Sequence, residues 1–218
     1  MPVTELAVFR LNPGITLDHP TLHSLLSRGK VAMESFQSSK GNPKKFYFLQ
    51  QTEDPSCIYI VGWWDSVAEH MNEFIPAPEN QSIMNEMKEA KLDSLDYFGH
   101  FDCDQEKIAV EAPVVSVGIH KVAKEKKEAF EKKFDEVKGK LDDYMWKGTK
   151  PVAGWRLDLP KEEAESENAM EQFVLFCGWD SLERHTKDFI SSEGATEYRQ
   201  IAKFVDSFDI KHARVVEL

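Results

Sequence analysis

The sequence has few cysteines, no long apolar run and a shortage of positive charge. Its three cysteines, Cys57, Cys103 and Cys177, are odd in number and widely spaced, so we expect reduced thiols and not a disulfide framework. No apolar run approaches the roughly 20 residues of a membrane span. Residues 1–5 lack the basic and apolar regions of a secretory signal. We therefore expect a soluble, cytoplasmic protein.

The charge balance limits the partners. The chain has 27 Lys and Arg against 38 Asp and Glu, a formal net charge of −11. Nucleic acids and anionic membranes are bound by basic patches, so neither is expected as a partner. The sequence also lacks a P-loop and the motifs GxGxxG, GxSxG and CxxC. His19 and His23 have no third ligand at a recognisable spacing. We expect no cofactor and no metal site.

One motif is present twice. The pattern Trp-Asp-Ser-x3-His-x3-Phe-Ile begins at Trp64 and again at Trp179, which is 179 − 64 = 115 positions later. Each copy follows an apolar run, residues 57–61 and 173–177. An internal repeat at this distance predicts two similar halves. We place a first domain at 1–103, a linker at 104–113 and a second domain at 114–218.

Each half has the same predicted order of elements. The first half has strands at 6–11, 46–49, 57–64 and 95–103, with a helix from about 18 and a second helix at 66–92 that is broken at 76–78. The second half has strands at 114–122, 152–159, 173–179 and 208–216, and helices at 124–146 and 181–205. Residues 161–168 are expected to form an acidic loop. The order β-α-β-β-α-β is typical of the ferredoxin-like unit, an antiparallel sheet with two helices on one face.

The other face of each sheet needs a cover. Large apolar side chains occupy consecutive positions, such as 46–48 and Trp63-Trp64, and strands of this kind are usually buried on both faces. We therefore expect an α+β fold in which the two sheets cover each other as a barrel within one chain.

The resemblance to a known family is carried by the strand that ends in Trp64-Asp65-Ser66, with His70 on the next helix, and by the second copy of this motif at Trp179. With the order β-α-β-β-α-β, these residues resemble the dimeric α/β-barrel superfamily, and most of all its antibiotic-biosynthesis-monooxygenase (ABM) domains. Stress-responsive A/B-barrel domains are near relatives. The resemblance implies a barrel cavity that binds an apolar, often aromatic, metabolite. It implies a cofactor-independent monooxygenase, or a related lyase or cyclase. A non-catalytic ligand-binding or stress-responsive protein is the alternative. Haem binding occurs elsewhere in the superfamily, and tandem barrels of this kind can pair as homodimers.

The motif residues have structural as well as chemical interpretations. Ser66 and Ser181 follow a strand and precede a helix, as helix N-caps do. His70 lies on the buried stripe of its helix, since residues 67, 70, 71 and 74 have the spacing i, i+3, i+4, i+7. His185 repeats this placement. Each imidazole can be a hydrogen-bonded core group or a general base.

The candidate site combines histidines and aromatic side chains. His70, His185 and His100 are the candidate catalytic residues. An aligned pair is not expected on the last strands, because matching residues 93–94 with 206–207 sets His212 opposite Gly99. The candidate substrate-binding residues are Trp63, Trp64, Trp155, Trp179, Tyr97, His120 and His212. Positions that differ between the halves, such as Trp63 and Gly178, are where one cavity could have specialised.

Overall fold

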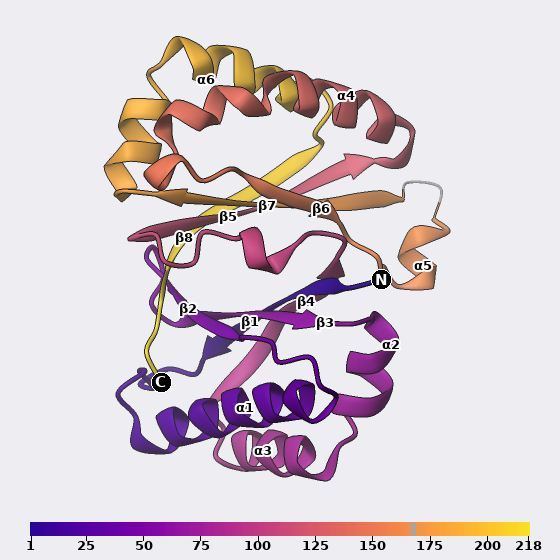
Figure 1. Cartoon of the computed structure of the whole chain (residues 1–218), viewed down its shortest axis with the longest axis vertical. Coiled ribbons are helices and arrows are strands. Elements are labelled where there is room, and N and C mark those ends of the chain that lie inside the picture. Colours follow the sequence, from indigo (N-terminus) through magenta and orange to yellow (C-terminus); the bar gives the residue numbers. More distant parts are fainter. Residues whose placement is uncertain (167–168) are drawn as a thin grey trace. The chain divides into compact units, whose positions relative to one another are not determined.

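The computed structural model describes residues 1–166 and 169–218, which form two compact units (Figure 1). Unit 1 contains Met1–His100 together with Val215–Leu218, and unit 2 contains Phe101–Arg214. The predicted linker, residues 104–113, lies within unit 2. The last four residues belong to unit 1, where the Val216 amide donates a hydrogen bond to the Phe48 carbonyl at 2.8 Å.

Unit 1 has four antiparallel strands with helices on one face (Figure 1). Its strands are β1 (Val3–Leu11), β2 (Tyr47–Gln51), β3 (Cys57–Trp64) and β4 (Asp93–Phe101), in the spatial order β4-β1-β3-β2. Its helices are α1 (Pro20–Ser39), α2 (Val67–Glu69) and α3 (Pro78–Glu89), and a π-helical turn, η1 (His70–Phe74), follows α2. The break predicted at 76–78 falls between η1 and α3, because Pro78 has no amide hydrogen to continue a helix.

Unit 2 has the same strand order, β8-β5-β7-β6. Its strands are β5 (Val114–Ala123), β6 (Val152–Trp155), β7 (Met170–Trp179) and β8 (Ser207–Val215). Its α-helices are α4 (Lys127–Val137), α5 (Lys161–Ala164) and α6 (Glu193–Tyr198). Its 3₁₀ turns are η2 (Gln105–Lys107), η3 (Lys124–Lys126), η4 (Lys138–Tyr144), η5 (Trp146–Gly148) and η7 (Arg199–Lys203), and η6 (Arg184–Phe189) is a π-helical turn. The α+β class and the order β-α-β-β-α-β of each unit agree with the sequence expectation.

Several boundaries differ from the prediction, and three of the differences are in unit 2. The helix expected at 124–146 is α-helical only in α4 and continues as 3₁₀ turns, where Gly139 lowers helix propensity. Strand β6 ends at Trp155, four residues before the predicted end. Part of the expected loop is the short helix α5, and positions 167 and 168 of that loop lie outside the described residues.

Each unit has its own core between the sheet and the helices. In unit 1 the core joins Trp64 of β3 to Leu22 and Leu25 of α1. In unit 2 it joins Trp179 of β7 to Phe130 and Phe134 of α4. No helix in the described parts of the chain has the length and apolar character needed to cross a bilayer. The barrel between the two sheets stays a prediction.

Candidate functional site

The first Trp-Asp-Ser-x3-His motif meets a buried glutamate in unit 1. The Trp64 indole Nε1 donates to Glu5 Oε2 at 2.7 Å. The His70 ring stacks on the Trp64 ring, with 3.9 Å between centroids and an interplanar angle of 7°. His70 Nε2 lies 3.8 Å from the same Glu5 oxygen, and His70 Nδ1 lies 2.8 Å from His100 Nε2. The four side chains form one cluster, the unit 1 cluster.

Local structure explains why His70 points into this cluster. The Ser66 hydroxyl accepts the Glu69 amide at 3.0 Å, so the predicted N-cap is confirmed. The Glu69 carboxylate accepts the Asp65 amide at 2.8 Å. The chain then winds as the π-helical turn from His70 to Phe74, a conformation frequent at functional sites. The cap fixes the start of the helix, and the π turn sets the rotation of the imidazole.

Burial makes Glu5 the unusual member of the unit 1 cluster. Its exposed fraction is 4%, and those of Trp64, His70 and His100 are 0%, 2% and 0%. Desolvation by burial raises the pKa of Glu5 to about 7, although the Trp64 hydrogen bond and the His100 charge act to lower it. A carboxyl group with a pKa near neutrality can both accept and return a proton at pH 7.

A cavity of about 500 Å³ opens onto Glu5 and His70. It lies on the helix-covered face of the unit 1 sheet, because its lining includes Ala7 of β1, Leu25 of α1 and Ile83 of α3. The apolar part of its lining is Ala7, Phe9, Leu25, Leu26, Met33, Phe48, Ile60, Phe74, Ile75, Ile83, Met84, Met87, Leu95 and Phe98. Glu5 and His70 are thus polar groups that converge at one end of a largely apolar pocket, an arrangement typical of ligand sites.

The second copy of the motif builds a similar cluster in unit 2. The His185 ring stacks on Trp179, with 4.2 Å between centroids and an angle of 8°. His185 Nδ1 lies 2.7 Å from His212 Nε2. The Trp179 indole, however, donates to the Ser116 hydroxyl at 2.9 Å. Ser181 caps the Arg184 amide at 3.1 Å, as predicted.

The strand registers identify Ser116 as the counterpart of Glu5. Val3 pairs with Trp64 and Glu5 with Gly62 in unit 1. Val114 pairs with Trp179 and Ser116 with Cys177 in unit 2. A Cβ atom at Gly62 would lie 2.6 Å from Glu5 Oε2, so the glutamate requires glycine opposite it. In unit 2 the position of Gly62 is occupied by Cys177, which faces the smaller side chain of Ser116. Burial raises the pKa of the Cys177 thiol to about 12, and a hydrogen bond with Ser116 partly opposes this.

The expectation that His100 and His212 are not equivalent is wrong. The two histidines make equivalent hydrogen bonds. His100 Nε2 pairs with His70 Nδ1 in unit 1, and His212 Nε2 pairs with His185 Nδ1 in unit 2. The alignment that matches residues 93–94 with 206–207 is shifted by one residue at the histidines. Between that point and its histidine, the last strand of unit 1 has one residue more than that of unit 2. In a strand this shift exchanges the two faces, which hid the pair.

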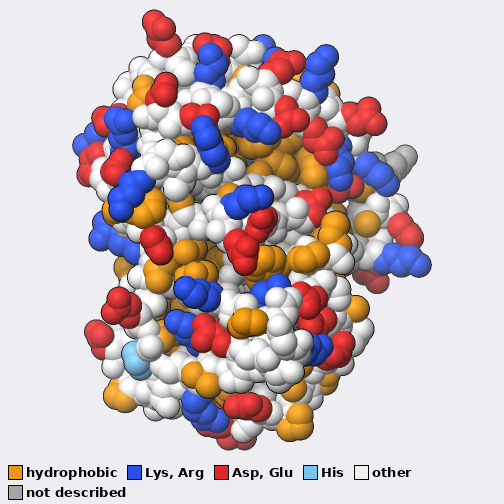
Figure 2. Space-filling view, in the orientation of Figure 1, with side chains coloured by type: hydrophobic (Ala, Val, Ile, Leu, Met, Phe, Trp, Pro, Cys, Tyr) orange, Lys and Arg blue, Asp and Glu red, His pale blue; other side chains and the backbone are white. Residues whose placement is uncertain are grey.

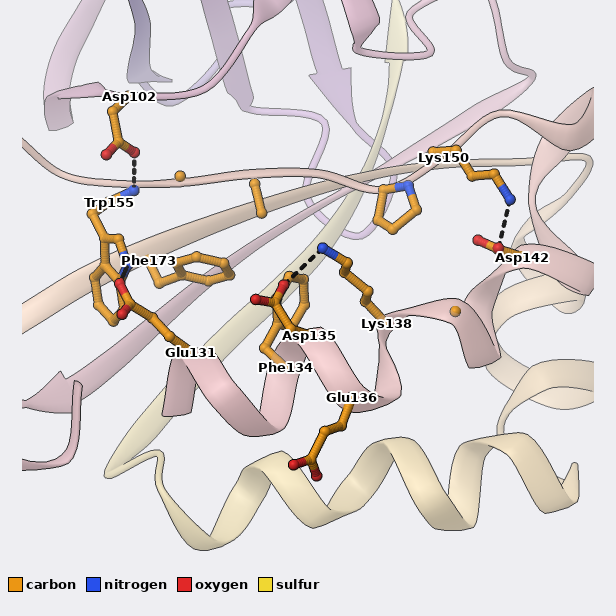
Figure 3. A pocket seen from close by; sticks show the side chains of 14 residues that line it. Asp102, Glu131, Phe134, Asp135, Glu136, Lys138, Asp142, Lys150, Trp155 and Phe173 are labelled. Carbon is orange, nitrogen blue, oxygen red and sulfur yellow. Dashed lines mark hydrogen bonds and ion pairs between the residues drawn. The ribbon is translucent and has the colours of Figure 1, made fainter. Parts of the chain in front are cut away.

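Trp155 lies beside a different hollow. A groove of about 780 Å³ in unit 2 is lined by Trp155, Phe134 and Phe173 together with charged side chains (Figure 3). Its charged groups are largely paired, for example Lys138 with Asp135 at 2.7 Å. The Trp155 indole donates to Glu131 at 2.7 Å. Apolar side chains are visible in the hollow between α4 and β6 (Figure 2).

The remaining predicted residues are apart from the unit 1 cluster. Trp63 and Tyr97 are the strand neighbours of Trp64 and Phe98, so their side chains lie on the sheet face away from the unit 1 cluster. Lys44 Nζ lies 3.9 Å from the Trp63 ring centroid. His120 is buried in unit 2 among Phe130, Phe173 and Phe208. Burial lowers the pKa of His120 to about 4, so its imidazole is neutral at pH 7.

The sequence interpretation missed Glu5, Gly62 and Ser116. The strand was expected to begin at Leu6, which left Glu5 outside it. The available signal was period-two alternation: Val3, Glu5, Ala7, Phe9 and Leu11 share one face of β1. Extending the comparison of the halves to Val3-Thr4-Glu5 and Val114-Val115-Ser116 would have found the substitution.

Comparison with known proteins finds the fold in solved structures. A candidate monooxygenase from Fusobacterium nucleatum has a TM-score of 0.61 at 11% identity, over 99% of this chain and 93% of that chain. A candidate monooxygenase from Lactobacillus acidophilus has a TM-score of 0.58 at 9% identity, over 99% of both chains. An anthrone oxidase-like protein has a TM-score of 0.62 at 10% identity, over 99% of this chain and 92% of that chain.

These likenesses show that the chain shares its fold with the three proteins. No protein-family model matches the sequence, and no curated protein matches it. Fold alone does not determine an activity; the chemistry of a protein depends on its site, which here is the unit 1 cluster and its cavity.

Proposed function

We propose that the chain binds an apolar or aromatic small molecule in the unit 1 cavity and oxygenates it as a cofactor-independent, monooxygenase-like enzyme. The observation that carries this proposal is the placement of Glu5 and His70 at one end of a cavity of about 500 Å³. That volume is within the range of about 300–1,000 Å³ of small-molecule sites. The names of the fold neighbours agree with this class of reaction.

Each member of the unit 1 cluster has a distinct role in the proposal. Glu5 is the general base, because it lines the cavity and its pKa of about 7 matches the working pH. His70 also lines the cavity and holds the ligand by a hydrogen bond. Trp64 and His100 are positioning residues: the first donates to Glu5, and the second fixes the His70 ring.

The proposed reaction converts an acidic CH₂ group between aromatic rings into a ketone. Glu5 takes one proton, and the resulting carbanion transfers electrons to O₂ and forms a C–O bond. The peroxide then loses water, with Glu5 returning the proton. The balance is CH₂ + O₂ → C=O + H₂O, so carbon is oxidised, O₂ is reduced and no further reductant is needed. The apolar walls exclude bulk water from the carbanion.

We propose that the units are ABM-type halves in tandem and that their sheets pack together as an intramolecular barrel. The support is that Leu6, Leu49 and Val61 alternate with residues of the unit 1 core, so the sheet face away from the helices is apolar as well. The cavity described here is on the helix-covered face and does not depend on the barrel.

Ligand binding without turnover is the alternative. Met33, Met84 and Met87 line the cavity, and methionine adapts its shape to different ligands. This favours a binding protein of broad specificity.

Oxygen uptake with anthrone as the probe separates the two functions. We expect the wild-type chain to consume one O₂ for each anthraquinone formed, and Glu5→Gln to lower the rate by about 100-fold. Gln keeps an oxygen acceptor for the Trp64 indole but cannot act as a base. Ser116→Ala, at the equivalent position of unit 2, is the matched control and should retain the rate, with folding checked by circular dichroism.

Two outcomes would contradict the enzyme assignment. One is a wild-type rate no higher than the uncatalysed oxidation for anthrone and for related acidic CH₂ compounds. The other is full activity of Glu5→Gln. Quenching of intrinsic fluorescence by the same compounds, without turnover, would favour the binding protein.

A further inference from the structure

The unit 1 cavity has a second polar end. Glu5 and Asn12 both line it, and seven residues of extended chain place their Cα atoms about 23 Å apart at ~3.3 Å per residue. Asn12 is held there by two hydrogen bonds to the chain before β4. Its amide donates to the Leu92 carbonyl at 2.9 Å, and its side-chain nitrogen donates to the Lys91 carbonyl at 2.8 Å. The cavity is therefore elongated along β1, with Glu5 at one end and the Lys91 turn at the other.

Two lysines line this far end. Lys88 is in the last turn of α3, and Lys91 follows the helix with a φ of 51°. Within residues 1–166 and 169–218, neither ammonium group lies in an ion pair. By contrast Arg28, also in unit 1, binds Glu86 through two hydrogen bonds of 2.6 and 2.8 Å. The helix C-terminus accounts for a cation at position 88, but a left-handed backbone at position 91 favours glycine or asparagine.

The other groups at this end do not cancel the positive charge. Among the described residues that line this end, Asp93 has the carboxyl group. Burial raises the pKa of Asp93 and so disfavours its charged form. Asn12 and Ser94 are neutral. The far end thus presents two cations against one partly desolvated carboxyl group, whereas the near end presents Glu5.

We propose that the ligand of unit 1 is an elongated aromatic or apolar carboxylate, whose anionic group lies at Lys88 and Lys91 while its other end reaches Glu5 and His70. This inference rests on the proposed function of the cavity. The reverse orientation would bring two carboxylates together at Glu5 and is disfavoured by their repulsion. The lysines act as specificity-determining residues and take no part in proton transfer.

A matched pair of probes tests the inference. We would measure binding of 2-anthracenecarboxylate and of its neutral carboxamide by probe fluorescence, at low salt, to the full-length chain. Two exposed charge contacts predict that the carboxylate binds about fivefold more tightly than the carboxamide. In Lys88→Gln/Lys91→Gln this preference should vanish while carboxamide binding is unchanged. Lys30→Gln removes a charge of the same unit outside the cavity lining and should keep the preference.

Salt is a second readout of the same contacts. Screening should remove most of the carboxylate preference at ~1 M ionic strength, where the Debye length is about 3 Å. Equal affinity for the two probes, or a preference that survives in the double lysine variant, would overturn the inference and leave the proposed function standing. Failure of both probes to bind would overturn both.

Discussion

The two units share three members of a side-chain cluster and differ in the fourth. In both, a tryptophan stacks on a histidine, and that histidine meets a second histidine. The indole donates to Glu5 in unit 1 and to Ser116 in unit 2. The shared residues therefore explain how each unit is built. The position that differs, Glu5, supplies a buried carboxyl group to the unit 1 cavity.

The difference extends to the strand opposite. Gly62 leaves room for the Glu5 carboxylate, while Cys177 fills the corresponding space beside Ser116. Unit 1 pairs the large Glu5 side chain with glycine, and unit 2 pairs the small Ser116 side chain with cysteine. Both combinations fill the space between the two strands. The pair has to change together, which makes the comparison between units open to a direct experimental test.

The largest expected effect concerns the pH dependence of stability. The pKa of Glu5 is raised from 4.5 to about 7 in the folded chain, so folding favours its protonated form. That stabilisation is fully present below pH 4.5 and is lost as the pH rises to about 7, a difference of about 3 kcal/mol. Glu5→Gln should not show this loss. Urea unfolding of both proteins at pH 4.5 and at about pH 8 measures it.

Ser116→Ala is the control for this measurement, because it removes no titratable group. Its unfolding free energy should change with pH as that of the wild-type chain does. If the curve of Glu5→Gln also runs parallel to that of the wild type, Glu5 titrates normally and the argument for a buried base is lost.

A smaller effect is expected from making unit 1 resemble unit 2. Gly62→Cys places a Cβ within 2.6 Å of Glu5 Oε2 and 3.0 Å of the Phe46 ring, and overpacking of this kind costs about 1–3 kcal/mol. In Glu5→Ser/Gly62→Cys the main clash is gone, so the double variant should recover part of the loss. A double-mutant cycle in urea gives the coupling energy. Strictly additive effects would mean that the two positions are independent.

Part of this arrangement could be predicted from the sequence. The repeated motif indicated the helix caps at Ser66 and Ser181, which the structure confirms, and the stacking side of each helix at His70 and His185. Periodicity and capping are local properties, and each follows from residues a few positions apart. The break before Pro78 was predictable for the same reason.

The rest depends on pairing between distant residues. Glu5 belongs to the site because β1 pairs with β3 in one particular register, and no local pattern specifies that register. The equivalence of His100 and His212 was missed by a single-residue shift on the last strand. A glycine at position 62 has meaning only once the neighbouring carboxylate is known. Long-range contacts of this kind decide the chemistry of the cavity.

The most direct test of the account is a structure of the chain with 2-anthracenecarboxylate bound. We expect the ring system in the unit 1 cavity, with its carboxylate at Lys88 and Lys91 and its far ring directed toward Glu5 and His70. A ring system in the groove beside Trp155, with the unit 1 cavity empty, would contradict it.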